Sequence, residues 1–297
     1  MELLEDYLER QRQRVEAALD QWLPSPDSYP PLLMEAMRYS VFAGGKRLRP
    51  ILVLAAAEAV GGDAEATLPA AAALEYIHTY SMIHDDLPAM DDDDYRRGKL
   101  TSHKVYGEAM AILAGDALLT HAFEVLNGPP LVQRFPAGLL QQVSYRVARA
   151  AGSFGMIGGQ VMDMASEGKQ ASLEVLEYIH RHKTAALLTA AVTTGGLLGA
   201  ATEAQVQALE RYGHDVGWAF QIADDLLDVE GDTATIGKQV GRDAVLAKVT
   251  YPGLLGIETS RQRATELMQQ GIAALAAFGP RAERLRQIAA YIVARNV

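Results

Sequence analysis

Residues 67–91, TLPAAAALEYIHTYSMIHDDLPAMD, join a long helix-forming segment to a group of aspartates. Ala, Leu and Met are good helix formers, and the apolar residues keep helical spacing up to Asp85. Pro88 disfavours α geometry at Leu87, so we predict that the helix ends or kinks there. Because residues six apart on one continuous helix point to different sides, this break is what lets Asp91 return from the loop toward Asp85.

The rest of the chain has the same helical character. Ala, Leu, Met, Gln and Glu dominate, and breaks fall at Gly and Pro. Alternating strand patterns are missing, and Ile51–Leu54 is the only strand-like run. At this length one large or two small domains are possible, and we predict a single all-α domain over residues 1–297. Helical segments are expected near residues 67–87, 104–127, 137–166, 172–199, 203–229, 260–277 and 281–295.

A second aspartate group lies in FQIADDLLD, residues 220–228. Asp224 and Asp228 share a helix face, where like charges at i, i+4 destabilise a helix by roughly 0.2–0.5 kcal/mol. This cost suggests a missing cationic partner, and hard carboxylate oxygens suit Mg²⁺ bound together with substrate phosphates. We interpret Asp92, Asp93 and Asp94 as a solvated acidic loop. The predicted metal-binding residues are Asp85, Asp86, Asp91, Asp224, Asp225 and Asp228.

Basic residues lie close to these acidic groups in the sequence. Lys46, Arg47 and Arg49 follow Gly44-Gly45, where glycine lets the backbone approach a ligand and arginine offers forked donors to phosphate. Together the acidic and basic groups predict one phosphorylated substrate held through Mg²⁺ and a second held by a metal-free basic pocket. Further candidate ligands of phosphate are His78, Arg96, Arg97, Lys183, Thr184, Gln221, Lys238 and Lys248.

Composition excludes several other classes of protein. The formal net charge of -10 argues against a nucleic-acid partner, and the absence of Cys excludes disulfides and thiolate chemistry. The acidic, amphipathic N-terminus lacks the basic start of a signal peptide. No uninterrupted apolar run approaches the roughly 18 residues of a membrane helix. We therefore expect a soluble, cytoplasmic protein without a membrane span.

Six motifs occur along the chain in a specific order. They are GGKRLRP (44–50), DDLPAMD (85–91) with RRG (96–98), GGQ (158–160) with Asp163, KT (183–184), FQIADDLLD (220–228) and Lys238. With these motifs in this order the chain resembles the bacterial farnesyl diphosphate synthases, which are short-chain trans-prenyltransferases. The resemblance extends from about residue 30 to the C-terminus, although Leu100 and Ser102 stand where many relatives have Pro and Cys.

The resemblance implies an isoprenoid synthase-type helical bundle around a deep central cavity, usually in a homodimer. It implies three Mg²⁺ ions held by Asp85, Asp91 and Asp224, with Asp228 in support. Isopentenyl diphosphate would be held by Gly45, Lys46, Arg49, His78 and Arg97. The allylic diphosphate would be held by Arg96, Lys183, Thr184, Gln221 and Lys238, of which the last four are also the catalytic candidates.

The implied reaction is the head-to-tail condensation of isopentenyl diphosphate with dimethylallyl and geranyl diphosphate. The allylic diphosphate ionises, and (2E,6E)-farnesyl diphosphate and diphosphate are the products. Tyr80 and Ser81 are the candidates for the cavity floor that limits product length, and helical spacing alone does not choose between them. In the family an aromatic residue five positions before the first aspartate goes with a C15 product, which Tyr80 fits; a C20 geranylgeranyl product is the alternative.

Three other readings remain open. A terpene cyclase of the same fold would need the aspartates but not a second diphosphate site, and the basic residues near Lys46 argue against it. A His-Asp metal phosphohydrolase would use His78, His84 and Asp85, and leaves the second aspartate group unexplained. A non-catalytic subunit of a heteromeric synthase would be expected to have lost one aspartate group, whereas this chain keeps both.

Overall fold

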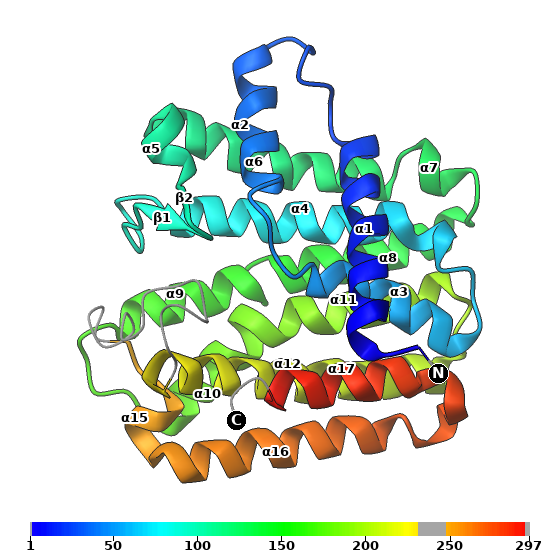
Figure 1. Ribbon diagram of the computed structural model, residues 1–297, viewed down its shortest axis with the longest axis vertical. Coiled ribbons are helices and arrows are strands. Elements are labelled where there is room, and N and C mark those ends of the chain that lie inside the picture. Colours follow the sequence, from blue (N-terminus) through cyan, green and yellow to red (C-terminus); the bar gives the residue numbers. More distant parts are fainter. Residues whose placement is uncertain (1, 231–247, 295–297) are drawn as a thin grey trace. The chain divides into compact units, whose positions relative to one another are not determined.

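The computed structural model describes residues 2–230 and 248–294, and the predicted all-α fold is confirmed (Figure 1). The α-helices are α1 (Leu4–Trp22), α2 (Pro31–Val41), α3 (Leu48–Val60), α4 (Leu68–Asp85), α5 (Ser102–Tyr106), α6 (Glu108–Leu126), α7 (Pro129–Val132), α8 (Ala137–Ala151), α9 (Met156–Ser166), α10 (Leu173–Ile179), α11 (Ala186–Leu198), α12 (Glu203–Glu230), α15 (Tyr251–Leu255), α16 (Ile257–Ala274) and α17 (Glu283–Ala294). Two 3-10 helices, η1 (Glu65–Thr67) and η3 (Ala276–Ala282), a π-helix, η2 (His180–Ala185), and two short strands, β1 (Tyr95–Arg96) and β2 (Lys99–Leu100), complete the described part.

The sequence-based boundaries need three changes. Gly107, at a φ of 85°, separates α5 from α6, and residues 152–155 separate α8 from α9. The segment 172–199 is interrupted by η2, a π-helix that helix propensities do not reveal. The strand-like run Ile51–Leu54 lies inside α3. The Ala-rich segment that follows it favours a helix, and this outweighs the strand preference of Ile51 and Val53.

The chain divides into two compact units. The first comprises residues 1–51 and 65–144, and the second comprises residues 52–64 and 145–297. The expectation that residues 1–297 form one domain stays a prediction, and each unit is described by itself below.

In the first unit α4 is the central helix. It is apolar on nearly all sides, as expected for a helix that is buried all round, and Leu74 and Ile77 are fully enclosed. Helices α1, α2 and α6 pack against it. Gly115 of α6 faces His84 of α4 so closely that a Cβ there would lie 2.1 Å from the imidazole Nε2. This close approach brings α6 against the end of α4 that carries Asp85.

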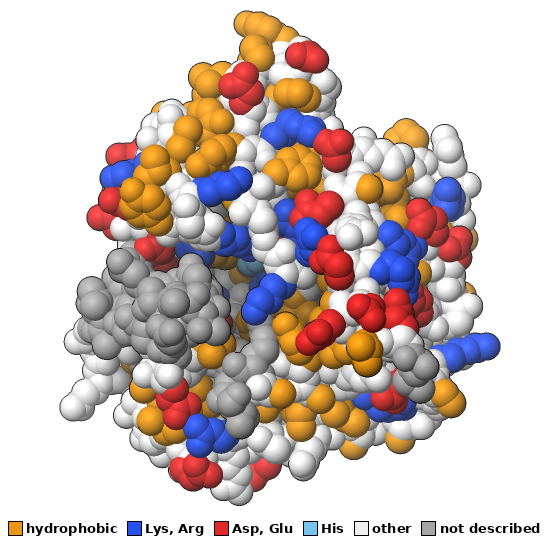
Figure 2. Space-filling model, in the orientation of Figure 1, with side chains coloured by type: hydrophobic (Ala, Val, Ile, Leu, Met, Phe, Trp, Pro, Cys, Tyr) orange, Lys and Arg blue, Asp and Glu red, His pale blue; other side chains and the backbone are white. Residues whose placement is uncertain are grey.

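Helix α6 also carries an apolar outer side. Ile112 and Leu113 are 44% and 53% exposed. The stretch Glu108–Val132 is long and apolar enough to cross a membrane by length and composition, and 39% of its most apolar window is buried. Asp116 and Glu124 interrupt it, so it is not an uninterrupted apolar run. Hydrophobic side chains also gather over neighbouring α2 in Figure 2.

In the second unit α12 is the central helix and contacts η2, α11, α16 and α17. The π-helix η2 lies between two glycines that permit close backbone approach. A Cβ on Gly159 of α9 would lie 2.1 Å from the backbone nitrogen of Lys183. A Cβ on Gly217 of α12 would lie 2.7 Å from the Cα of Ala185. Since neither glycine can gain a side chain without a shift of backbone, the position of η2 is tightly fixed between α9 and α12.

Candidate active site

The first aspartate group lies where α4 ends. The helix ends at Asp85, two residues before the break predicted at Leu87, and the following loop folds back over its last turn. The backbone N–H of Asp91 donates to the carbonyl oxygen of Asp85 at 2.8 Å, and that of Asp93 donates to the carbonyl oxygen of Asp86 at 3.2 Å. Both Asp85 and Asp91 are half-buried. The predicted return of Asp91 toward Asp85 is therefore confirmed.

Asp86 differs from its neighbour because it has an internal partner. Arg96 donates to its Oδ1 at 2.6 Å and lies 3.4 Å from Asp93. Burial raises the pKa of Asp86 to about 6 even though the bond from Arg96 opposes that shift. Arg96 comes from the β1–β2 hairpin, whose loop residues Arg97 and Gly98 both have positive φ. Asp86 therefore anchors this hairpin, and its role as a metal ligand stays a prediction.

Arg49, His78 and Arg97 form a basic pocket in the first unit. Burial, followed by repulsion from Arg97, lowers the pKa of Arg49 to about 10 against the attraction of Glu75. Burial, then Arg49 and Arg97, holds the pKa of His78 well below its ordinary value, and burial likewise lowers the pKa of Arg97. Nearby arginines add to this effect of burial at each of the three groups: Arg97 at Arg49, both of these at His78, and Arg47 and Arg96 at Arg97. A bound anion would offset it.

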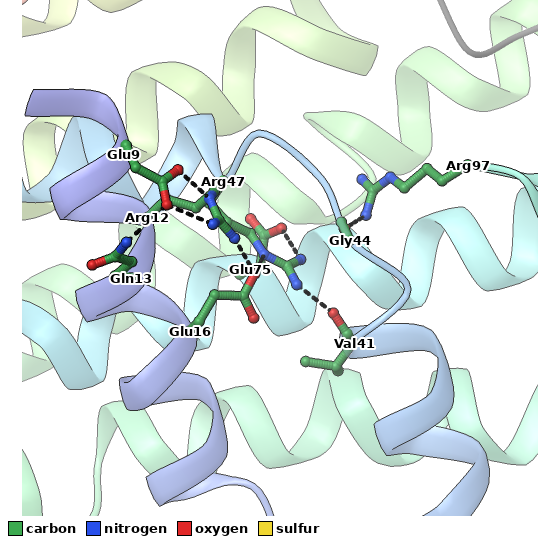
Figure 3. Close-up of polar contacts among 9 residues, drawn as sticks. All are labelled: Glu9, Arg12, Gln13, Glu16, Val41, Gly44, Arg47, Glu75 and Arg97. Carbon is green, nitrogen blue, oxygen red and sulfur yellow. Dashed lines mark hydrogen bonds and ion pairs between the residues drawn. The ribbon is translucent and has the colours of Figure 1, made fainter. Parts of the chain in front are cut away.

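The glycines before this pocket have a local role. Gly44 and Gly45 have φ of 98° and 128°. The carbonyl oxygen of Gly44 accepts a hydrogen bond from Arg97, and a Cβ on Gly45 would lie 2.6 Å from the same guanidinium. The close approach that glycine permits is thus to Arg97, and the loop holds this side chain in the pocket (Figure 3).

Arg47 is separated from its neighbours in the motif. It is 2% exposed, and its guanidinium donates to Glu16 at 2.8 Å, to Glu75 at 2.9 Å and to the carbonyl oxygen of Val41 at 2.6 Å (Figure 3). The positive charge of Arg47 is therefore balanced by two glutamates of the first unit. Lys46, by contrast, is exposed, which leaves it accessible to a ligand.

The second aspartate group divides in a similar way. Asp224 and Asp228 are half-exposed on one face of α12, whereas Asp225 is 3% exposed. The backbone N–H of Tyr251 donates to Oδ2 of Asp225 at 3.0 Å, and Gln221 donates to its Oδ1 at 3.1 Å. Sequence spacing places the three aspartates together but does not reveal that Asp225 is held by internal donors.

The π-helix η2 carries Lys183 and Thr184 beside this group. The hydroxyl of Thr184 donates to Oε1 of Gln221 at 2.6 Å, and Lys183 donates to Oδ2 of Asp163 at 2.6 Å. Burial favours the neutral form of Asp163, but Lys183 and then Lys248, 3.7 Å away, hold its pKa below the ordinary value. The second unit therefore brings these groups together. Lys238 lies outside the described residues.

The carboxylates fit the chemistry of a Mg²⁺ site. Asp85 with Asp91, and Asp224 with Asp228, offer hard oxygen donors that are accessible from solvent. Within the described residues, ligand atoms of Asp92, Asp94 and His103 also lie within 4.8 Å of one another. Asp94 is engaged by Lys104 at 2.7 Å. The sequence analysis interpreted Asp92, Asp93 and Asp94 as a solvated loop and did not predict that Asp92 and Asp94 lie close to His103. Their separation from His103 in the sequence gives no signal of this contact.

The chain-length candidates lie just before Asp85. Tyr80 is buried, its ring meets His84 edge-on, and its hydroxyl has no hydrogen-bond partner in the described structure. Burial raises its pKa to about 12. Ser81 donates to the carbonyl oxygen of His78 at 2.9 Å and is thereby tied to its own helix. Of the two, Tyr80 is the bulkier side chain enclosed by the fold.

The positions of the histidines disfavour a His-Asp phosphohydrolase. Nε2 of His84 lies 3.1 Å from the carbonyl oxygen of Ile112 and 4.0 Å from Asp116, both on α6. His78 lies in the basic pocket described above. The two rings are thus directed to different surroundings, rather than joining Asp85 in one set of ligands.

Comparisons with known proteins agree with this geometry. The sequence profile of a family described as polyprenyl synthetase matches residues 30–279. A dimethylallyltranstransferase of Fischerella ambigua (strain UTEX 1903) is 50% identical over 99% of this chain and 84% of its own length. A geranylgeranyl diphosphate synthase of Cyanophora paradoxa is 46% identical over 98% of this chain and 96% of its own. The crystal structure of an FPP/GFPP synthase from Zymomonas mobilis superposes with a TM-score of 0.86 at 39% identity, covering 98% of both chains.

Replacing Arg47 tests its structural role. We expect Arg47→Met to lower the free energy of unfolding by about 3–5 kcal/mol, because it leaves Glu75 buried without its partner. The matched control Lys46→Met removes an exposed charge and should change it by no more than about 0.5 kcal/mol. Urea denaturation measures both values, and equal stability of the two variants would contradict this assignment.

The low pKa of His78 predicts a pH dependence of stability. Below its ordinary value of about 6.5 the unfolded chain takes up a proton that the folded chain does not, so stability falls as the pH falls. The contribution is at most about 1.4 kcal/mol per pH unit. Denaturation curves between pH 7.5 and 5.5 should show a smaller loss for His78→Gln than for the unaltered chain. Parallel losses would show that His78 does not contribute.

Proposed function

Because the chain belongs to the polyprenyl synthetase family and is a prenyltransferase, we propose that it is a Mg²⁺-dependent farnesyl diphosphate synthase. Its substrates are isopentenyl diphosphate and the allylic dimethylallyl and geranyl diphosphates. Successive condensations give (2E,6E)-farnesyl diphosphate and release diphosphate. The names of similar proteins support the reaction class, and they differ in the product.

The proposed Mg²⁺ ligands come from the two aspartate groups. Asp85, Asp91 and Asp224, supported by Asp228, would hold three Mg²⁺ ions. When bound, these ions stabilise the charge that builds on the departing diphosphate. The other proposed ligands of that diphosphate are Arg96, Lys183, Thr184, Gln221 and Lys238. Arg96, Lys183 and Lys238 would supply cations and Gln221 an N–H donor to its oxygens, which favours cleavage of the allylic C–O bond. The hydroxyl of Thr184 donates to Gln221 in this structure.

The observation that carries the proposal is the basic pocket of the first unit. Burial lowers the pKa of all three of its groups, Arg49, His78 and Arg97. Arg97 further lowers the pKa of Arg49, and both arginines further lower that of His78. Groups whose positive charge is disfavoured in this way favour the binding of an anion. With Lys46 and the Gly45 backbone, this pocket would hold isopentenyl diphosphate without metal. Holding its double bond at attack distance from the allylic carbon then makes the reaction effectively unimolecular. A terpene cyclase has no use for such a second diphosphate site.

The apolar outer side of α6 supports a homodimer. Ile112 and Leu113 expose large apolar surface on a helix that is otherwise packed against the core, and such surface is typical of an interface. We propose that a second copy of the chain covers it. The cytoplasmic location expected from the sequence stays a prediction.

The test is a condensation assay. Purified protein is incubated with Mg²⁺, isopentenyl diphosphate and dimethylallyl diphosphate, and product length is measured by mass spectrometry. The proposal predicts mainly C15 diphosphate, and none when EDTA removes the metal. Mainly C20 product would replace the farnesyl assignment by the geranylgeranyl one, and no condensation by a folded protein would overturn the proposed activity.

Tyr80 tests the proposed limit on product length. We expect Tyr80→Ala to shift the main product from C15 to C20 or longer, because removing the ring deepens the space beneath Asp85. Tyr80→Phe is the matched control: it keeps the ring, removes only the hydroxyl that lacks a partner, and should still make C15. Unchanged C15 output from a folded Tyr80→Ala variant would contradict the role of Tyr80.

A further inference from the structure

His180 is a buried histidine for which the proposed reaction has no task. It stands on η2, three residues before Lys183, and is 3% exposed. Its Nε2 lies 3.3 Å from Oδ2 of Asp225. We propose that His180 is a positioning residue for the allylic diphosphate site, acting through Asp225; this inference rests on the proposed function.

A chain of contacts, which we call the circuit, runs from His180 of η2 through Asp225 and Gln221 of α12 back to Thr184 of η2. His180 approaches Oδ2, Gln221 donates to Oδ1 at 3.1 Å, and Thr184 donates to the same Gln221 at 2.6 Å. The circuit begins and ends on η2, and Asp225 and Gln221 of α12 form its middle. Lys183 lies between the two η2 members. The circuit therefore fixes Lys183 and Gln221 relative to Asp224, the neighbour of Asp225.

The tautomer of His180 follows from its partner. Oδ2 of Asp225 already accepts the backbone N–H of Tyr251, and Nε2 of His180 makes a favourable contact with the same oxygen when it carries the ring hydrogen. Nδ1 is buried and has no hydrogen-bond partner in the described structure. Burying an unsatisfied ring nitrogen is unfavourable, and an apolar ring would avoid it. A polar ring at this position therefore points to a use for its Nε2–H, which is the contact with Asp225.

His180 also connects the circuit to the start of α15. Its ring packs against that of Tyr251, with centroids 5.2 Å apart at an angle of 32°. The backbone N–H of Tyr251 donates to the same Oδ2 of Asp225. Since Gly159 and Gly217 fix the backbone of η2, loss of the His180 contact should loosen the Asp225 carboxylate rather than move the helix.

Three substitutions separate positioning from packing. His180→Phe keeps a ring against Tyr251 and removes the donor. His180→Gln places an amide nitrogen near the position of Nε2, whereas His180→Asn is equally polar but too short to reach Asp225. If His180→Phe does not fold, the Gln and Asn pair carries the test.

The kinetic test compares kcat/KM for geranyl diphosphate with KM for isopentenyl diphosphate in each variant. We expect His180→Phe and His180→Asn to lower kcat/KM for geranyl diphosphate by about 10- to 100-fold, as is usual when an outer-layer partner of a metal or anion site is lost. KM for isopentenyl diphosphate should change less than about twofold, since its proposed ligands lie in the first unit. His180→Gln should recover most of the activity.

Two further readouts do not depend on turnover. Calorimetry of inorganic diphosphate with Mg²⁺ should show metal-dependent binding weakened at least about tenfold in His180→Phe and restored in His180→Gln. Hydrogen exchange of the Tyr251 amide should be faster in His180→Phe, because its acceptor Asp225 is no longer held.

The possible outcomes are distinct. Wild-type kinetics and binding in a folded His180→Phe or His180→Asn variant would overturn the inference, and so would equal losses for both substrates or a failure of His180→Gln to recover. Absence of condensation by the wild-type chain would overturn the proposed function instead, and the diphosphate binding and Tyr251 exchange would still decide whether His180 positions Asp225.

Discussion

A charge that is buried in a protein needs a partner, and this constraint sorts the charged residues of the chain. Arg47 is balanced by Glu16 and Glu75, Asp86 is bonded to Arg96, and each of these pairs holds a loop or hairpin against the first unit. At Arg49, His78 and Arg97, by contrast, burial lowers the pKa, and nearby arginines lower it further. The internally balanced charges hold the first unit together, and the poorly balanced ones are the groups that we propose as diphosphate ligands.

The same sorting operates in the second unit. Asp225 accepts hydrogen bonds from Tyr251 and Gln221 and lies 3.3 Å from Nε2 of His180, whereas Asp224 and Asp228 remain accessible on α12. Adjacent aspartates thus have different surroundings, and the role of all three as metal ligands stays a prediction. Gly159 and Gly217 let α9 and α12 approach the backbone of η2 closely, and that approach places Thr184 and His180 beside Gln221 and Asp225.

Sequence alone predicted the helical class and the end of α4 to within two residues, since propensity and Pro88 act locally. The sequence analysis grouped Arg47 with Lys46 and Arg49, because a motif shows residue types and does not show burial. The partners of Arg47, Glu16 and Glu75, are far from it in the sequence, so its internal pairing could not be predicted. The sequence analysis likewise could not separate Asp225 from Asp224, or find η2, because a π-helix reflects tertiary packing by Gly159 and Gly217 rather than local preference. His180 has no sequence signal beyond its place near Lys183.

The central claim is that the two aspartate groups are the ligands of metal and that the basic pocket of the first unit binds diphosphate without metal. Anomalous diffraction from crystals containing Mn²⁺ and diphosphate tests it most directly. The account predicts Mn²⁺ beside Asp85 and Asp91 and beside Asp224, and metal-free diphosphate at Arg49, His78 and Arg97. Mn²⁺ bound only at Asp92, Asp94 and His103, or diphosphate absent from both sites, would contradict it.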